Sequence, residues 1–434
     1  MLKRKAYDRL ISWKAGKSKS ALLVTGARQV GKTVLIREFA EKNYDSFVEI
    51  NLIENSQACE SFNEAKSSLD LFLRITVEAS SELISNKTLI FIDEVQEAKE
   101  IVTYIKFLVE RGEYDYILSG SMLGVELNDI RSAPVGFLTI IEMFPLDFEE
   151  FCWAKGFQNQ AFTIMKTHFE EETPVEDYLH ERLLSLFHSY IIVGGMPEAV
   201  SLFIATNSIQ EVRSVQTDII DLYRHDIARY SKQDDAVTIK RIFDLIPSEL
   251  NQQNKRFIIK NIDGSAKFER NENRFLWIVD ANAALVAYTV EEPRHPLLMS
   301  MKSNYFKLFM SDVGLLTCLC GMDTVRDILN KNVAINFGAL YENIVAQELF
   351  THKHRLFYFR SKKMGEVDFI IEYPSSEVVP IEVKSGKNYK RHCALNSILD
   401  VPNYNFSKAY VLHEENLTVE KKIRYIPIYM VSCL

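Results

Sequence analysis

A phosphate-binding pattern lies close to the N-terminus. The pattern G-x-x-x-x-G-K-[ST] is met by residues 26–33, which read GARQVGKT. In such a loop several backbone N–H groups and the start of a helix face one point and favour negative charge there. Lys32 is expected to reach the β- and γ-phosphates of a nucleoside triphosphate, and the Thr33 hydroxyl is expected to bind Mg²⁺. The sequence therefore predicts a site for ATP and Mg²⁺.

Two carboxylates follow an apolar run in the same region. Residues 89–92 read LIFI, and Asp93 and Glu94 come directly after them. A continuous apolar run is typical of a strand buried on both faces of a parallel sheet, and ligands bind at the carboxyl ends of such strands. Asp93 is expected to hold Mg²⁺ in the Walker B role, and Glu94 to polarise the attacking water as general base. Glu94 would distinguish an ATPase from a passive nucleotide binder.

A second set of charged residues lies near the C-terminus. Asp368 and Glu382 fall on two neighbouring predicted strands, and Lys384 shares one strand face with Glu382. These two carboxylates, completed by Glu342 from a preceding helix, could hold Mg²⁺ against a scissile phosphate. Lys384 would then orient or deprotonate the attacking water. The alternative is a half-buried strand pair with a surface salt bridge.

The elements that position these residues follow from the hydrophobic pattern. Strands are predicted at 21–24, 47–52, 89–94, 116–121 and 137–143, and helices near 32–40 and 59–83. The fourth strand ends in small hydroxyl residues, and Ser119 or Ser121 could orient the lytic water or touch the γ-phosphate. They could equally be ordinary loop residues. The expected nucleotide contacts are Gly26, Ala27, Arg28, Gln29, Val30, Gly31, Lys32, Thr33, Val34 and Ser119.

Composition narrows the class of protein. The chain has 434 residues and a net charge of −8, which argues against a protein coated in non-specific phosphate contacts. Residues 353–391 nevertheless carry nine Lys or Arg against five Asp or Glu, a local basic surface suited to nucleic acid. Six scattered cysteines without a CxxC pair favour reduced thiols over a zinc site. With no apolar run near about 18 residues, a cytoplasmic protein without a membrane span is expected.

Several of these segments resemble a known prokaryotic family. Residues 21–33, the Asp93-Glu94 strand end, residues 119–121 and residues 144–151 (FPLDFEEF) look like its AAA-type ATPase domain. The family has a conserved C-terminal domain of unknown function, the DUF4143 type, which resembles the PD-(D/E)XK nuclease fold. Relatives often carry Arg or Lys where this chain has Phe137. A basic residue acting on a neighbouring subunit would have to be another, such as Arg131.

The resemblance and the pattern together give an α/β domain plan. A parallel sheet flanked by helices is expected over 1–155, a helical lid-like region over 156–235, a winged-helix-like linker over 236–335 and a nuclease-like α/β domain over 336–434. In the linker, residues 275–279 read as a strand, and Lys255, Arg256, Lys260 and Lys267 are candidate phosphate contacts or, more simply, a solvated face. The turn GGMP at 194–197 reads as structural.

Two functions remain in view. The first is a Mg²⁺-dependent ATPase whose nucleotide state controls a C-terminal module that acts on or binds nucleic acid, most simply DNA. The second is an ATP-dependent signalling switch in which the C-terminal module is catalytically silent and binds a protein partner. The intact set of Glu342, Asp368, Glu382 and Lys384 favours the first. Oligomeric state is left open.

Overall fold

The apolar runs of the N-terminal third form a parallel sheet. In the computed structural model, which describes residues 2–16, 20–120, 136–231, 233–252, 255–262, 264, 267–330 and 337–434, the strand order is β2-β3-β4-β1-β5. Val24 lies opposite Ser119, and Asn51 lies opposite Asp93, so these strand ends share one edge. The strands are β1 (Ala21–Thr25), β2 (Ser46–Asn51), β3 (Thr88–Asp93), β4 (Asp115–Ser119) and β5 (Leu138–Glu142).

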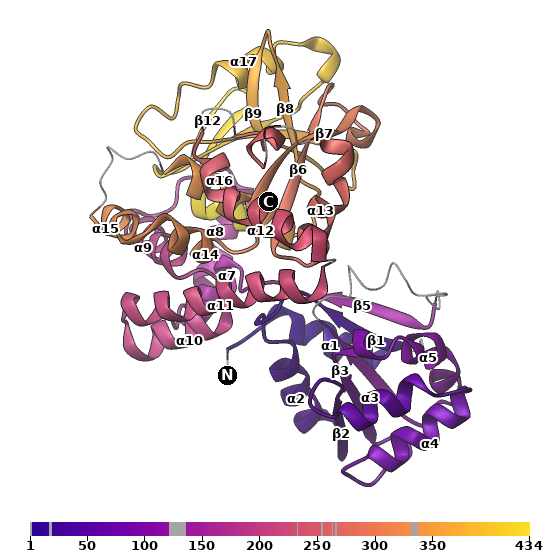
Figure 1. The fold of residues 1–434 in the computed structure, drawn as a ribbon. Coiled ribbons are helices and arrows are strands. Elements are labelled where there is room, and N and C mark those ends of the chain that lie inside the picture. The colour runs from indigo at the N-terminus through magenta and orange to yellow at the C-terminus, as the bar shows by residue number, and fades with distance from the viewer. Residues whose placement is uncertain are drawn as a thin grey trace. The chain divides into compact units, whose positions relative to one another are not determined.

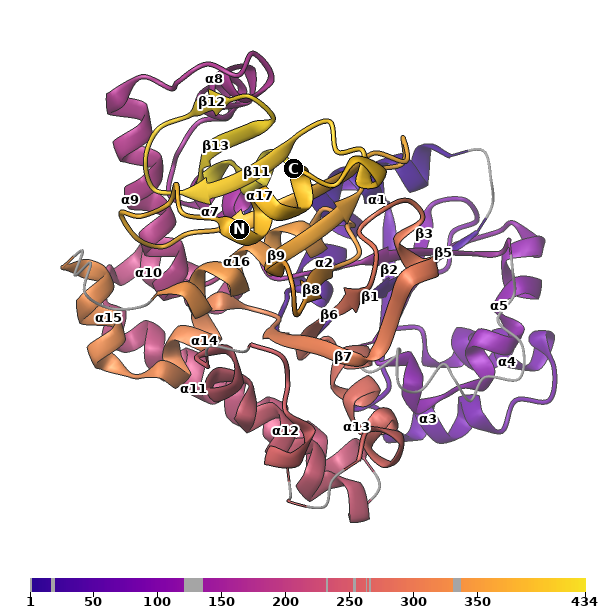
Figure 2. The same cartoon turned by 90° about the horizontal axis from the view of Figure 1, so that it is seen from above.

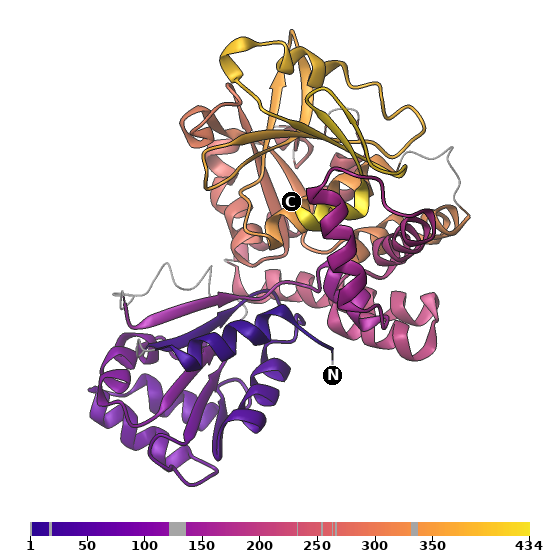
Figure 3. The same cartoon turned by 180° about the vertical axis from the view of Figure 1, so that it is seen from behind.

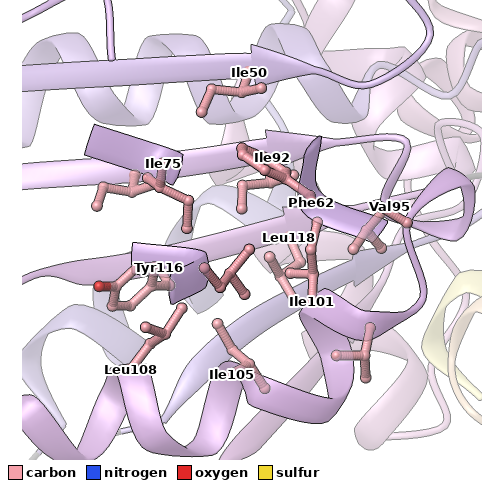
Figure 4. Packing of buried hydrophobic residues seen from close by; sticks show 14 of the residues in the cluster. Ile50, Phe62, Ile75, Ile92, Val95, Ile101, Ile105, Leu108, Tyr116 and Leu118 are labelled. Atoms are coloured by element: carbon pink, nitrogen blue, oxygen red, sulfur yellow. The ribbon is translucent and has the colours of Figure 1, made fainter. Parts of the chain in front are cut away.

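Helices cover both faces of this sheet. One face carries a core in which Phe62 and Ile105 pack with Ile92 and Leu118 of the strands (Figure 4). The other face is covered by the helix that buries Phe39 against the strands. The helices are α1 (Lys5–Ala15), α2 (Lys32–Asn43), α3 (Ser56–Asn63), α4 (Ser68–Glu78), η1 (Val95–Glu97) and α5 (Glu100–Arg111). Burial on both faces explains why β1, β3 and β4 are apolar without alternation.

A second, mixed sheet organises the rest of the chain. Its strand order is β12-β13-β11-β10-β9-β8-β6-β7, seen from above in Figure 2 with β12 and β7 at opposite ends. The strands are β6 (Ala284–Val290), β7 (Met301–Met310), β8 (Phe357–Ser361), β9 (Gly365–Glu372), β10 (Val378–Val383), β11 (Ala409–His413), β12 (Thr418–Glu420) and β13 (Ile423–Pro427). The pairs β9·β10 and β8·β9 are antiparallel, whereas β10·β11 and β6·β8 are parallel.

Helices precede and surround the second sheet. The C-terminal turn η6 packs against α8, α9 and α16 (Figure 3). The helical elements up to the first strand are α7 (Phe148–Ala154), α8 (Asn159–Glu170), α9 (Asp177–Val193), α10 (Pro197–Thr206), α11 (Ile209–Tyr230), α12 (Gln233–Leu250), η3 (Ile259–Asn261) and α13 (Phe268–Asp280). Those that follow are η4 (Leu297–Ser300), α14 (Val313–Cys320), α15 (Met322–Leu329), α16 (Gly338–Thr351), α17 (Cys393–Leu399), η5 (Pro402–Tyr404) and η6 (Ile428–Cys433).

The chain divides into two compact units (Figure 1). The first contains Lys3–Phe144, and the second contains Pro145–Val279 and Ala283–Leu434. The first unit therefore ends earlier than the predicted boundary at 155, because α7 is already part of the second. Strands β6 and β7 lie before the predicted boundary at 336, yet β6 pairs with β8 in the same sheet. The expected linker over 236–335 is thus not a separate winged-helix unit, since its strands complete the second sheet.

One predicted element is wrong. Residues 275–279, expected as a strand, belong to helix α13. Asn271, Phe275 and Ile278 are its buried residues, at the i, i+4, i+7 spacing of one helix face. The other strands named above agree with the structure to within one or two residues.

The glycine pair at 194–195 is a packing feature of the second unit. A Cβ on Gly195 would lie 2.0 Å from the Leu146 carbonyl oxygen, and Gly194 has φ +72°. The Gly195 N–H donates to the Asp312 carboxylate over 2.6 Å, and the Leu146 N–H donates to the Gly195 carbonyl over 2.7 Å. Burial raises the pKa of Asp312 to about 6, against the opposing effect of the backbone N–H groups of Gly195, Gly314 and Leu315. These contacts support the structural interpretation of this turn.

Across the described part of the chain, no single helix is both long and apolar enough to cross a membrane. The bent pair α9 and α10 passes that test by length and composition.

Candidate functional site

The phosphate loop joins β1 to α2 and depends on two glycines. Gly26 has φ +136°, and a Cβ there would lie 2.1 Å from the Met143 carbonyl oxygen. Gly31 has φ +89° and is the N-cap of α2. Both backbone conformations are ones that residues with a Cβ rarely adopt. The loop therefore turns tightly against the end of β5 and presents the first N–H groups of α2, which is the arrangement that binds phosphate.

Lys32 is the cation of this loop. Its side chain is only 7% exposed, and its Nζ donates to the carbonyls of Gly26 and Ala27, each over 2.9 Å. Burial lowers the pKa of Lys32 to about 8, although the carboxylates of Glu94 and Asp93 favour its charged form. A phosphate placed beside it would favour the ammonium further, so this lysine suits an anionic ligand.

Asp93 gathers the polar groups at the end of β3. Its Oδ2 accepts from Thr33 Oγ1 over 2.8 Å, its Oδ1 accepts from the Glu94 N–H over 3.0 Å, and the Ser119 hydroxyl also donates to it. A carboxylate beside a hydroxyl, next to a phosphate loop, is the donor set that fits Mg²⁺. Ser119 is fully buried, and its hydroxyl helps to hold Asp93 in place.

Glu94 stands at a strained turn. Its backbone is left-handed at φ +57°, uncommon for a residue with a side chain, and such outliers gather at functional sites. Gln96 Nε2 donates to Glu94 Oε2 over 2.6 Å. This hydrogen bond fixes the carboxylate of the expected general base. Sequence reasoning missed Gln96, although it lies two residues away.

Arg4 is a second residue of this site that was not predicted from the sequence. Its guanidinium is buried, with Nη1 donating to the Val30 carbonyl over 2.9 Å and Nη2 donating to the Phe144 carbonyl over 2.6 Å. It therefore joins the phosphate loop to the end of the first unit. Its partners lie 26 and 140 residues away, and such separations leave no local signal.

Replacing Arg4 by alanine should weaken ATP binding about tenfold. Two hydrogen bonds from a charged group are lost, and part of their stabilisation, about 1.5–3 kcal/mol each, holds the loop in its binding shape. Isothermal titration with a non-hydrolysable ATP analogue measures the affinity. Arg9→Ala, the loss of an exposed arginine of α1, is the control and should leave affinity unchanged. Equal affinities for the two variants would contradict a role for Arg4 in the loop.

The second candidate site lies in the second unit and is built from α16, β9 and the end of β10. Glu342, Asp368, Glu382 and Lys384 line one cavity of about 500 Å³. Asp368 Oδ2 accepts from the Val383 N–H over 2.9 Å, and Lys384 Nζ donates to Glu382 Oε1 over 2.6 Å. The structure thus brings together all four residues that the sequence singled out.

Two lysines not predicted for this site lie within it. Lys307 of β7 is fully buried, with Nζ 2.7 Å from Glu366 Oε1, 3.5 Å from Glu342 Oε2 and 4.0 Å from Asp368 Oδ1. Lys255 pairs with Glu342. Nothing in the sequence indicated a functional role for Lys307, since its neighbours on the strand are apolar.

Two of the four candidate phosphate contacts lie near this site. Lys255 and Arg256 line a cavity beside the carboxylates, whereas Lys260 and Lys267 line neither cavity.

The charged groups in this cluster shift one another's pKa values. Burial, followed by the charges of Glu342 and Glu382, raises the pKa of Asp368 well above its usual range. Burial also raises the pKa of Glu382, against the effect of Lys384. Burial alone would raise the pKa of Glu342, but Lys307 and Lys255 outweigh it and lower that pKa. Burial would lower the pKa of Lys307, but the surrounding carboxylates hold it above its ordinary value.

The carboxylate oxygens of this cluster are of the chemical type that binds Mg²⁺. Glu342 Oε2 and Glu382 Oε2 are buried oxygens without a hydrogen-bond partner, and carboxylate oxygens are preferred Mg²⁺ ligands. Within the described ranges, no three His, Cys, Asp or Glu side chains are grouped closely enough to hold a metal ion. In this structure the lysine ammonium groups lie closest to the carboxylates. Ser121 and Arg131 lie outside the described residues.

Family models match three parts of the chain. Residues 18–152 match the model described as "AAA domain", 184–326 match "Domain of unknown function (DUF8612)", and 337–431 match "Domain of unknown function (DUF4143)". Among curated proteins, none matches the sequence. The first match contains the phosphate loop, Asp93 and Glu94, and the third contains Glu342, Asp368, Glu382 and Lys384.

Several solved structures have some likeness to this one. The Walker-type ATPase of Pyrococcus abyssi is 14% identical, with a TM-score of 0.44, over 74% of this chain and 96% of its own. Cdc6p from Pyrobaculum aerophilum is 12% identical, with a TM-score of 0.27, over 76% and 94%. The RuvB Holliday junction branch migration motor of Thermotoga maritima is 14% identical, with a TM-score of 0.30, over 68% and 90%.

The family models and the geometry of the two sites agree. The phosphate loop, the Asp93-Glu94 strand end and the five-stranded parallel sheet all lie in the part that matches the AAA model. The chain therefore carries an N-terminal P-loop ATPase domain of AAA type and a C-terminal domain of the DUF4143 type.

Proposed function

We propose that the first unit hydrolyses ATP with Mg²⁺ and that its nucleotide state controls nuclease chemistry in the second unit. In the first unit, the α2 N-terminus and Lys32 bind the phosphates, and Thr33 and Asp93 would hold Mg²⁺. The ion would neutralise charge on the transferred phosphoryl group. Glu94, fixed by Gln96, accepts a proton from the attacking water. Ser119 keeps Asp93 in position.

The nuclease proposal for the second unit rests on one observation. Four residues line one cavity, and they are Glu342, Asp368, Glu382 and Lys384. These residues come from one helix and two strands. Asp368 and Glu382 would hold Mg²⁺, which would polarise a phosphodiester. Lys384, whose ammonium is charged beside Glu382, orients the attacking water and the phosphate oxygens. DNA is the proposed substrate, because the basic residues around the cavity suit a polyanion.

The test of this half is Asp368→Asn in the full chain. Cleavage of labelled DNA with Mg²⁺ and ATP should fall at least a hundredfold, because one metal-binding carboxylate is lost while side-chain shape is kept. Asp400→Asn, an exposed carboxylate of the same unit, is the matched control and should leave cleavage unchanged. Equal cleavage by wild type and Asp368→Asn would contradict the nuclease proposal.

One observation favours a second candidate function. Lys307 already lies among the carboxylates, so the charge of the cluster is largely balanced from within the chain. This arrangement suits an ATP-dependent signalling switch whose C-terminal module is catalytically silent and binds a protein partner. Under that function, neither wild type nor Asp368→Asn cleaves DNA, while ATP hydrolysis persists in both.

A further inference from the structure

A basic cavity lies beside the carboxylate cluster in the second unit. It has a volume of about 810 Å³ and is lined partly by β7, β8 and the turn before β9. Its lining includes the carboxylates Glu291, Glu366 and Asp368. Five cations outnumber these carboxylates at the wall, and they are Lys255, Arg256, Lys302, Arg360 and Lys362. A wall of this sign favours a polyanionic ligand.

This cavity adjoins the one that holds the catalytic candidates. Lys255 and Asp368 line both cavities. A ligand that fills the basic cavity would therefore reach the carboxylate cluster at Asp368. A flexible polyanion could extend from one cavity into the other, with a phosphate beside Asp368 and Lys384.

An aromatic residue is exposed at the basic cavity. The β7 ladder passes from Phe306, opposite Tyr288, to Lys302, opposite Thr289, so residues 303–305 bulge out of the sheet. Bulges of this kind re-aim side chains beside functional sites. Tyr305, in the bulge, is 42% exposed, and the Arg256 guanidinium lies 4.6 Å from its ring centroid. A planar cation beside an exposed ring makes a platform on which a base can stack.

The size of the cavity points to an unpaired strand. A volume of about 810 Å³ lies within the range of pockets that enclose one small molecule. A few unpaired nucleotides fit such a space, and their base faces are open to stacking on Tyr305. In a duplex the base faces are covered by their neighbours, so only phosphates would meet this wall. A basic groove combined with an exposed aromatic ring is the general solution for single strands.

We propose that this cavity binds single-stranded nucleic acid and guides it to the Asp368 site. The inference rests on the proposed function, since it names the substrate class of the same site. Tyr305 stacks on a base, and Lys302, Arg360 and Lys362 contact the phosphates. Binding itself needs neither ATP hydrolysis nor strand cleavage, so it can be measured separately from both.

The test is fluorescence anisotropy with the full chain in EDTA. The probes are a labelled 12-nucleotide single strand and a 12-base-pair duplex containing the same sequence. The single strand should bind at least tenfold more tightly than the duplex. Tyr305→Ala should weaken single-strand binding about tenfold, as expected for one lost stacking contact. Tyr178→Ala, the loss of an 83% exposed tyrosine elsewhere in the unit, should leave binding unchanged.

Charge contacts are tested with salt. Lys302→Ala and Lys362→Ala should each weaken single-strand binding and lower the slope of log K against log salt by about 0.7. Lys422→Ala, an exposed lysine beside β13, should change neither. Tighter binding of the duplex, or equal binding by wild type and Tyr305→Ala, would overturn the inference.

The outcomes also separate this inference from the proposed function. If Asp368→Asn abolishes cleavage of duplex DNA but Tyr305→Ala binds the single strand as tightly as wild type, the inference fails and the nuclease proposal stands. If the single strand binds through Tyr305 but nothing is cleaved, the binding site stands and the nuclease proposal fails. Absence of binding to either probe overturns both.

Discussion

Replacing Glu94 by glutamine should reduce ATP turnover by about a hundredfold to ten-thousandfold while leaving ATP affinity unchanged. Glutamine keeps the shape of the side chain but cannot accept a proton. Lys32, Thr33 and the α2 N-terminus, which bind the phosphates, are untouched by the change. Phosphate release measures turnover, and titration with ATP measures affinity in the same preparation.

Glu97→Gln is the matched control for this experiment. Glu97 is a carboxylate three residues away, at the end of η1. Its variant should turn over ATP like wild type. Turnover of Glu94→Gln at the wild-type rate would remove Glu94 from the mechanism and leave only a nucleotide-binding role for this strand end. Adding single-stranded DNA to wild type then tests whether the second unit stimulates turnover.

The parts of the fold and site that the sequence predicted are local. The phosphate loop carries its chemistry in eight consecutive residues, so its pattern can be recognised without knowing the fold. Asp93 and Glu94 end an apolar run, and parallel sheets place such ends at one edge. The C-terminal residues were found because Glu382 and Lys384 alternate along one predicted strand and Asp368 lies on the strand beside it.

The parts that the sequence did not predict depend on distant contacts. Lys307 lies in the run FKLFM, where its neighbours indicate only a buried strand, and its partners Glu342 and Asp368 lie far along the chain. Arg4 holds Phe144 from 140 residues away. Helix α13 was mistaken for a strand because residues 275–279 are apolar. The buried spacing of Asn271, Phe275 and Ile278 shows that the helical period was present over a longer window.

Lys307→Met should destabilise the second unit by about 3–5 kcal/mol, the usual result of removing one partner from a buried ion pair. Methionine fills a similar volume, so the loss is mainly that of the charge. Glu342 and Asp368 would then lose the fully buried ammonium that lies within 4.0 Å of each of them. Urea unfolding of the full chain in EDTA, followed by tyrosine and tryptophan fluorescence, measures the free energy of unfolding.

Lys302→Met is the matched control, because Lys302 lies on the same strand but is 46% exposed and pairs only at the surface with Glu291. Its effect should stay below about 1 kcal/mol. Adding Asp368→Asn to Lys307→Met should recover part of the lost stability, since it removes one of the repelling carboxylates, and the double-mutant cycle gives the coupling. Mg²⁺ in place of EDTA should also stabilise Lys307→Met more than wild type, because the carboxylates could then bind the ion. If Lys307→Met costs no more than Lys302→Met, the buried ammonium does not balance this cluster.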